Sequence, residues 1–375
     1  MKILILNWRD TKHPDAGGSE LHMQEIGSRW AKTGNQVSLY SSSFSGGLRQ
    51  EEIDGVDIQR IGNKYTVYPS ALRRLLSSQR KNQFDVIFES INTVPFFSPL
   101  FTRSPVVGQI YSLENKSVLL QEMSARMLPI ASVAYALSSA IPAVYKNCEI
   151  TTISNASKEV LVSRGFTSKK VHVAYPGMSD SWPSTLTLTP DIDRPNHSVV
   201  YLGRLKKYKG VQDILRALPL IKREIHDIKL RIIGKGDFEP TLRNMVDSLG
   251  IQDQVEFCGF VSEIEKARIL KESSVYICTS RDEGGWTISA VEAMSAGVPL
   301  LVTKSQLDVL DGGKTGWLLE NEDPALIAQK VIQMLQDRSL WASLSSSSLR
   351  YSKNFNWDGT ASKTFEALKK AAAAQ

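Results

Sequence analysis

Cysteine is scarce in this chain. The 375 residues include only Cys148, Cys258 and Cys278, and no Cys-x-x-Cys pair occurs. An odd number of widely spaced cysteines argues against a disulfide framework or a zinc-binding knot as the basis of the fold. Such low cysteine usage is typical of proteins in a reducing compartment, and we therefore expect a cytoplasmic location.

Long apolar runs are also lacking. The N-terminal run, residues 3–6, is too short for the hydrophobic region of a signal peptide and predicts a buried strand instead. Residues 127–145 carry no charge but include Pro129 and Pro142. Because a membrane-spanning helix needs about 20 apolar residues, this stretch predicts a buried or membrane-surface helix rather than a span.

Several functional signatures are missing as well. There is no internal repeat, which excludes a solenoid, and no Gly-x-Gly-x-x-Gly, so nothing favours a nicotinamide cofactor. No Asp-x-Asp pair ends a predicted strand, and we expect no metal ion. The net charge is +6, with its excess in the first half. Because the sequence has no RNA- or DNA-binding motif, this charge does not indicate a nucleic-acid partner. The remaining candidate partners are an anionic substrate and an anionic membrane surface.

What the chain does contain is a regular alternation of apolar strands and amphipathic helices. This alternation predicts an α/β fold with doubly wound parallel sheets. Residues 179–198, rich in Ser, Thr, Pro and Asp, read as a linker between two such domains. Strands are expected at residues 3–8, 37–40, 85–89, 105–110, 149–154 and 171–175, then at 198–205, 229–233, 255–260, 275–279 and 299–303. Helices are expected at residues 19–32 and from about residue 324 onward.

A glycine pair follows the first strand, in the sequence Gly17-Gly18-Ser19-Glu20. Glycines allow a ligand to approach the backbone, and the N-terminus of the following helix offers free N–H groups to a phosphate. An ordinary glycine turn explains the pair equally simply.

Cations follow the first strand of the second half, in Gly203-Arg204-Leu205 and Lys209-Gly210. A short loop would bring Arg204 and Lys209 together at the carboxyl edge of the sheet, where two fixed cations suit a diphosphate. The alternative is a solvated basic turn, since Lys206 and Lys207 are also present.

Acidic residues and glycines lie together in Asp282-Glu283-Gly284-Gly285-Trp286-Thr287, between a strand and a helix that carries Glu292. Backbone N–H groups of such a loop can face phosphate or hydroxyls, and carboxylates accept hydrogen bonds from sugar hydroxyls. The alternative for Glu292 is that it is an acid on the helix surface with no role in ligand binding.

Taken in order, these motifs resemble the family 4 retaining glycosyltransferases, which have the GT-B fold of two Rossmann-like domains facing a central cleft. The resemblance spans nearly the whole chain and is densest over residues 199–302. It implies a domain at residues 1–185 that binds the acceptor, a domain at 186–350 that binds a nucleotide-sugar donor, and a helical tail at 351–375 that crosses back to the first domain.

The resemblance also implies roles for individual residues. Arg204 and Lys209 would act in catalysis by stabilising the leaving diphosphate, which needs neither a metal nor a cofactor. Glu283 would also act in catalysis, in place of the family's acid in the loop around the donor sugar. Glu292 would bind the ribose of a UDP- or GDP-linked donor. Further donor contacts are expected at Gly17, Gly18, Gly234, Gly284, Gly285, Trp286 and Thr287, and acceptor contacts at Asn92, Tyr111 and Glu114.

Two positions depart from the family pattern. The family has an acid eight residues before the Glu292 position, where this chain has Gly284, with Glu283 one residue earlier. Many members also have a histidine where this chain has Tyr111. The expected activity is transfer of a hexosyl unit to a hydroxyl of a glycan or lipid-linked acceptor, with retention of configuration. The alternatives are a nucleotide-sugar epimerase of the same fold and a non-catalytic subunit that binds sugar nucleotides.

Overall fold

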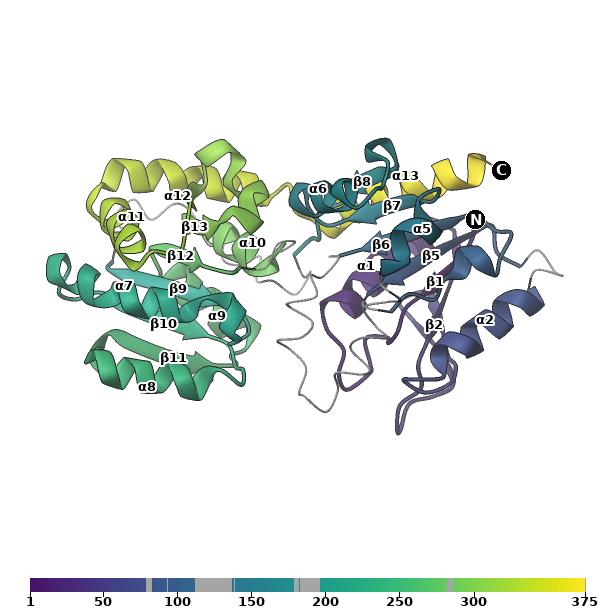
Figure 1. Cartoon of the computed structure of the whole chain (residues 1–375), viewed down its shortest axis with the longest axis horizontal. Helices are drawn as coiled ribbons and strands as arrows, with labels where there is room; N and C mark the ends of the chain where they lie inside the picture. Colours follow the sequence, from purple (N-terminus) through teal and green to yellow (C-terminus); the bar gives the residue numbers. More distant parts are fainter. Residues whose placement is uncertain are drawn as a thin grey trace. The chain divides into compact units, whose positions relative to one another are not determined.

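The computed structural model describes residues 1–78, 83–92, 94–111, 137, 139–178, 182, 196–281 and 286–374. The chain divides into two compact units (Figure 1): Met1–Gly177 with Asn356–Gln375, and Met178–Phe355. The divisions thus fall after residues 177 and 355, against the expected 185 and 350. The assignment of one unit to the acceptor and the other to the donor remains a prediction.

The described part of the first unit has an eight-stranded sheet in the order β3-β4-β2-β1-β5-β6-β7-β8. All neighbouring strands are parallel except β3 and β4. The strands are β1 (Lys2–Leu6), β2 (Gln36–Ser41), β3 (Gln50–Ile53), β4 (Val56–Arg60), β5 (Val86–Ile91), β6 (Val106–Ile110), β7 (Glu149–Thr152) and β8 (Val171–Val173). The helices are α1 (Gly18–Lys32), α2 (Val67–Ser78), α5 (Ile141–Tyr145), α6 (Asn155–Ser163) and α13 (Trp357–Ala373).

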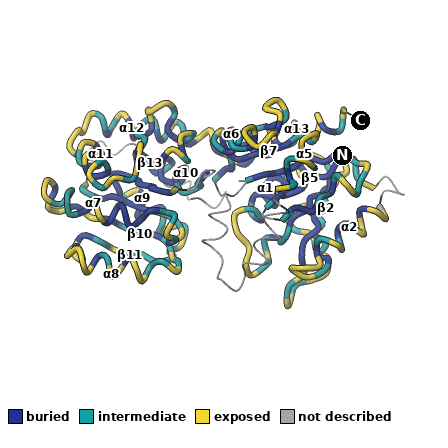
Figure 2. Tube along the Cα trace, viewed as in Figure 1, coloured by how far each residue is buried: buried dark blue, intermediate teal, exposed yellow. Residues whose placement is uncertain are grey.

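The alternating direction of side chains along each strand explains why helices cover both faces of this sheet. Ile3 and Ile5 of β1 pack in the cluster formed with α1 and α13, whereas Leu4 and Leu6 pack in the cluster formed with α2, α5 and α6. Successive side chains of a strand point to opposite faces, so a strand that is apolar throughout requires a helical layer on each side. Figure 2 shows the central strands of both units as buried, whereas the edge strands β3 and β11 are partly exposed.

The hairpin of β3 and β4 corrects the expectation of strictly parallel strands. It was not expected at all, because its strands carry many polar residues. Asp54 and Gly55 connect the two strands with φ of 49° and 81°. Two consecutive residues with positive φ are typical of the tight turns that join antiparallel strands, and β3 pairs antiparallel to β4 at the sheet edge.

The described part of the second unit has a six-stranded parallel sheet in the order β11-β10-β9-β12-β13-β14. Helices α7 and α11 cover one face with the core around Ile214, Val331 and Leu230. The strands are β9 (Ser198–Leu202), β10 (Lys229–Ile233), β11 (Val255–Gly259), β12 (Val275–Cys278), β13 (Leu300–Thr303) and β14 (Gly316–Leu319). The helices are α7 (Val211–Glu224), α8 (Glu239–Leu249), α9 (Glu263–Lys271), α10 (Ile288–Ser295), α11 (Pro324–Gln336) and α12 (Arg338–Ser352).

Two details differ from the expected strands of this unit. Strand β9 ends at Leu202 rather than at Leu205, because the chain turns there and the N–H of Lys206 donates to the carbonyl of Arg204 at 3.1 Å. Strand β14 was not expected. Among the described residues, none of the helices has both the length and the apolar character needed to cross a membrane.

Candidate functional site

The strand order of the second unit reverses between β9 and β12. From β9 the chain proceeds outward through β10 and β11, then returns to β12 on the other side of β9. In open α/β sheets, ligands bind beyond the carboxyl ends of the strands at such a reversal. The segments that leave β9 and β12 at this edge are residues 203–210 and the loop that begins at residue 279.

Arg204 and Lys209 lie on the first of these segments, and both contact Tyr208. The Arg204 guanidinium donates to the Tyr208 hydroxyl at 3.1 Å, and the Lys209 ammonium lies 4.9 Å from the centre of the Tyr208 ring. Arg204 is exposed, whereas Lys209 is half-buried and also donates to the Ser280 hydroxyl at 3.4 Å. The structure thus brings together the two cations expected to bind a diphosphate.

The two segments are joined by hydrogen bonds. The buried Thr279 hydroxyl donates to the carbonyl of Gly210 at 2.8 Å, and the N–H of Arg281 donates to the carbonyl of Tyr208 at 2.9 Å. Gly210 has a φ of 75°, and a Cβ there would lie 2.2 Å from the Thr279 carbonyl oxygen. Only glycine permits this close approach, which fixes residues 203–210, here called the cationic loop, against the end of β12.

Glu292 is buried on α10 and forms an ion pair that the sequence did not indicate. Its Oε1 accepts from the Lys266 ammonium on α9 at 2.7 Å, and Lys266 also donates to Glu263 at 2.8 Å. Burial raises the pKa of the Glu292 carboxyl, and the Lys266 charge opposes that shift. The helix holds this carboxyl in a fixed position at the reversal point of the sheet, and Lys266 supports it there.

Trp286 and Thr287 lead into α10. The Trp286 ring is buried against Phe355, with ring centres 4.8 Å apart. The Thr287 hydroxyl donates to the side-chain oxygen of Gln306 at 2.8 Å, and the Gln306 amide contacts the Cys278 sulfur at the end of β12. These contacts fix the entry to the helix and give Trp286 a packing role.

Gly234 follows β10 at the same edge of the sheet. It has a φ of 136°, and a Cβ there would lie 1.9 Å from the carbonyl oxygen of Gly203. Position 234 therefore requires glycine, because the loops after β9 and β10 contact each other here through their backbones. The donor contact expected for Gly234 stays a prediction.

In the first unit, Gly17 and Gly18 begin α1 at the carboxyl edge of the sheet. Neither has a positive φ, and a Cβ on Gly18 would meet no atom within 4 Å. The Glu20 carboxylate accepts from the Gly17 N–H at 2.8 Å and lies 3.7 Å from Arg9. Packing alone does not explain glycine at position 18, and space for a ligand is consistent with this geometry.

Tyr111 follows β6 and lies over the start of α1. Its hydroxyl donates to the Ser19 carbonyl at 3.5 Å, and burial raises the pKa of its phenol well above the usual range. His22 packs edge-on to Tyr111 and to Trp357, with ring centres 5.5 and 5.2 Å away. Tyr111 is thus a half-buried hydrogen-bonding residue, and the acceptor contact expected for it stays a prediction.

Asn92 is half-buried directly after β5, and a buried carboxyl holds the segment beyond it. Glu89 accepts from the backbone N–H groups of Phe96 and Ser98 at 2.6 and 3.2 Å, and from the Tyr145 hydroxyl at 2.6 Å. Burial raises the pKa of this carboxyl despite those donors. Glu89 thereby orders the loop that carries the expected acceptor contact.

Some expected site residues lie outside the described residues: Glu114, Glu283, Gly284 and Gly285, and with them Asp282. Their predicted roles therefore stay predictions. Sequence reasoning missed Tyr208, Thr279 and Lys266, which contact expected site residues. The signal for Thr279 was its position directly after a buried strand. Within the described ranges, no group of three or more His, Cys, Asp or Glu side chains is arranged to hold a metal ion.

Comparison with known proteins places both units in one family. Residues 190–351 match the glycosyl transferases of group 1, and residues 16–182 match glycosyltransferase family 4. An uncharacterised glycosyltransferase of Methanocaldococcus jannaschii is 24% identical, with 98% of each chain covered. A GDP-mannose-dependent alpha-(1-6)-phosphatidylinositol monomannoside mannosyltransferase of Mycobacterium tuberculosis is 29% identical over 47% of this chain and 48% of its own length.

Solved structures support the same assignment at the level of the fold. Anabaena HepE, solved in complex with UDP-glucose, matches with a TM-score of 0.70 and 18% identity, covering 99% of this chain and 100% of that one. The expected GT-B class, with two Rossmann-like α/β units, is confirmed. The chain belongs to the group 1, family 4 glycosyltransferases, enzymes that transfer a sugar from a nucleotide-sugar donor.

Proposed function

We propose that this chain is a retaining hexosyltransferase, which moves a hexosyl unit from a nucleotide diphosphate sugar to a hydroxyl of a glycan or lipid-linked acceptor. The observation that carries this proposal is the pair of cations on residues 203–210. Arg204 and Lys209 share the contact with Tyr208, and Thr279 holds their loop at the reversal point of the sheet. Two fixed cations on one short loop suit the two phosphates of such a donor.

In this proposal the second unit stabilises the leaving group. The bond between the donor's anomeric carbon and its diphosphate oxygen breaks, and the acceptor oxygen bonds to the same face of that carbon. The acceptor proton goes to the departing phosphate oxygen. Arg204 and Lys209 compensate the negative charge that develops there, and cations fixed in advance do so without reorganisation. Glu292, held by Lys266, accepts hydrogen bonds from the donor ribose.

The donor is proposed to carry UDP or GDP. One relative is named for its dependence on GDP-mannose, and a structural neighbour was solved with UDP-glucose. The name of that relative also specifies a lipid acceptor. A peripheral membrane position through α2 is consistent with exposed Arg73, Arg74 and Leu76, although Leu75 of the same helix is buried in the core. Arg80 and Lys81, which follow α2 in the sequence, lie outside the described residues.

The test is product analysis with the purified chain. We expect turnover of UDP- or GDP-linked hexoses with a panel of hydroxyl acceptors, and NMR of the product should show the same anomeric configuration as the donor. An inverted product would contradict retention. Formation of an epimer without an acceptor would identify an epimerase, and tight donor binding without any turnover would indicate a non-catalytic subunit.

A further inference from the structure

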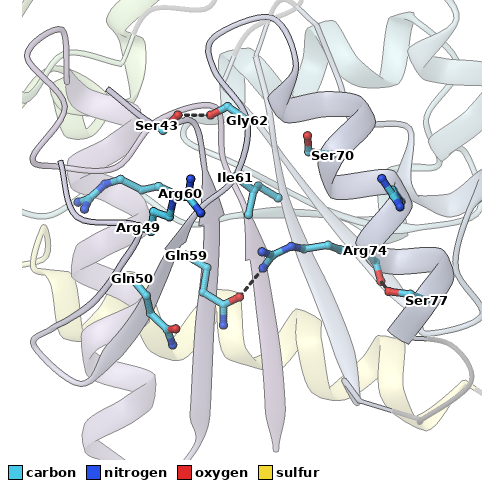
Figure 3. Close-up of a pocket in the computed structure, with 11 residues that line it drawn as sticks. Ser43, Arg49, Gln50, Gln59, Arg60, Ile61, Gly62, Ser70, Arg74 and Ser77 are labelled. Atoms are coloured by element: carbon cyan, nitrogen blue, oxygen red, sulfur yellow. Dashed lines mark hydrogen bonds between the residues drawn. The ribbon is translucent and has the colours of Figure 1, made fainter. Parts of the chain in front are cut away.

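The first unit contains a basic pocket with a volume of about 830 Å³ between β4 and α2 (Figure 3). A volume of this size accommodates a small-molecule ligand. No Asp or Glu lines the pocket among the described residues. Its lining consists of Ser43, Arg49, Gln50, Gln59, Arg60, Ile61, Gly62, Ser70, Arg73, Arg74 and Ser77.

The arginines of this pocket differ in how they are compensated. Arg60 is buried and neutralised by Asp10, with two contacts of 2.7 Å. Arg49 and Arg73 are exposed, and neither forms an ion pair with a described residue. Arg74 donates to the side-chain oxygen of Gln59 at 2.6 Å, as Figure 3 shows, rather than to a carboxylate. Three guanidinium charges therefore remain without a carboxylate partner in the described part of the chain.

A carboxylate on the same strand is kept apart from these charges. Asp57 of β4 accepts from the Gln50 amide and from the Gln59 amide, each at 2.7 Å. Both of its oxygens are thus occupied by neutral donors. The other end of the Gln59 amide accepts from Arg74, so the glutamine stands between the acid and the arginine. The arrangement preserves positive charge in the pocket.

Part of the pocket lies at the edge of the sheet where ligands bind. Ser43 follows β2 and Gly62 follows β4 (Figure 3), at the edge where the parallel strands of this sheet end. Gly17, Asn92 and Tyr111 follow β1, β5 and β6 at the same edge. Ligands of open α/β sheets bind at this edge, which is also where the acceptor contacts are expected.

We infer that this pocket binds a phosphate group carried by the acceptor. Guanidinium forks match the geometry of phosphate oxygens, and a pocket lined by three guanidinium groups without a carboxylate partner favours a ligand group that can carry two negative charges. The Ser70 hydroxyl, which has no partner among the described residues, supplies a further donor. The remaining volume has room for the sugar or polyol that bears the phosphate. This inference rests on the proposed function, because only a transferase requires an acceptor.

The first test uses inorganic phosphate as the probe in titration calorimetry, at constant ionic strength. The double variant Arg49→Gln/Arg73→Gln should bind phosphate about 100-fold more weakly, at about tenfold for each charge-assisted contact. The control Arg103→Gln removes an exposed arginine of the same unit outside the pocket and should bind like the wild type. All titrations are made in the Arg204→Ala background, which weakens phosphate binding at the proposed donor site, so that the measured heat reports on this pocket. Binding unchanged in the double variant would overturn the inference.

The second test separates the two sources of such a phosphate. If glucose 6-phosphate competes with inorganic phosphate and the protein does not bind vesicles, the acceptor is a soluble phosphorylated molecule. Arginine-dependent binding to phosphatidylcholine vesicles that contain phosphatidic acid identifies a lipid phosphate. Absence of binding to any of these probes would overturn the inference. UDP binding and donor turnover, measured in the same variants, report on the proposed function separately, since the pocket residues do not belong to the cationic loop.

Discussion

Arg204 and Lys209 contact the same tyrosine from opposite ends of a six-residue segment, residues 204–209, but they are anchored differently. Arg204 is exposed and donates to the Tyr208 hydroxyl, whereas Lys209 also contacts Ser280 beside the end of β12. Neither side chain belongs to the apolar core. Their loss should therefore affect chemistry much more than folding.

We predict that Arg204→Ala and Lys209→Ala each reduce kcat by about 100- to 1000-fold, because each removes a charge that stabilises the departing diphosphate, at about 2.7–4 kcal/mol. Steady-state kinetics with the preferred donor gives the measurement, and thermal unfolding should be nearly unchanged. Lys207→Ala is the matched control, since Lys207 is an exposed cation of the same loop. Near-wild-type turnover in both test variants would show that the diphosphate binds elsewhere.

His22 gives a prediction about pH. It is fully buried on α1, and burial lowers its pKa to about 3 from an ordinary value of 6.5. Between these values the unfolded chain binds a proton that the folded chain does not, so stability falls as the pH is lowered. The loss is about 1.4 kcal/mol per pH unit, or about 2 kcal/mol between pH 6.5 and pH 5.

The variant His22→Phe should lose this pH dependence, because phenylalanine can pack against Tyr111 and Trp357 without titrating. Denaturant unfolding at pH 7 and pH 5 provides the comparison. His226→Phe, at an exposed position of the other unit, should retain the wild-type dependence. Equal losses of stability in the wild type and His22→Phe would mean that other groups cause the acid sensitivity.

At the scale of elements, the donor site depends on the link between the loop after β9 and the end of β12. Thr279→Val keeps the shape of the side chain but removes one of the two donors to the Gly210 carbonyl, which still accepts from the Asp213 N–H at 2.9 Å, at a cost of about 0.5–1.5 kcal/mol. We predict lower stability and weaker donor binding together, because the same loop carries Lys209. Thr364→Val removes a buried hydroxyl of α13 in the other unit. It should leave donor affinity unchanged, and an equal effect of both variants on affinity would contradict the proposed link.

The sequence was informative where chemistry depends on neighbours along the chain. Arg204, Lys209 and Gly210 occupy one loop directly after a buried strand, and strand periodicity predicted their place at this edge of the sheet, although it extended the strand to Leu205. Glu292 could be placed on a helix, but its partner could not, because Lys266 reaches it from α9, 26 residues away. Contacts of this kind depend on how helices pack on the sheet, and no local pattern specifies them.

The basic pocket shows a second limit of sequence reasoning. It is built on β4, whose alternation of Val56, Ile58 and polar residues was not recognised as a strand, although Asp54-Gly55 is a common hairpin sequence. The clustering of Arg49 with Arg73 follows only from pairing β4 beside β2 and packing α2 against that edge. Charge spacing along the chain gave no sign of it.

At the scale of the whole molecule, the two units carry different parts of the proposed reaction. The cationic loop, Thr279 and Glu292 belong to the second unit, and the expected acceptor contacts and the basic pocket belong to the first. Each unit has its own sheet and its own apolar cores. Nucleotide binding should therefore stabilise one unit selectively, and this can be measured without knowing the acceptor.

We predict that UDP or GDP, at about 100 times its Kd, stabilises the second unit by about 2.7 kcal/mol. Hydrogen exchange followed by mass spectrometry should show added protection in residues 203–210, 279–281 and 286–292, because a bound diphosphate bridges the loop after β9 and the start of α10. Peptides from β4 and α2 should exchange as before. Arg204→Ala at the same nucleotide concentration should lose most of the protection, whereas Arg49→Gln/Arg73→Gln should retain it. Protection confined to the first unit would contradict the assignment of the donor to the second and would leave the cationic loop without its proposed ligand.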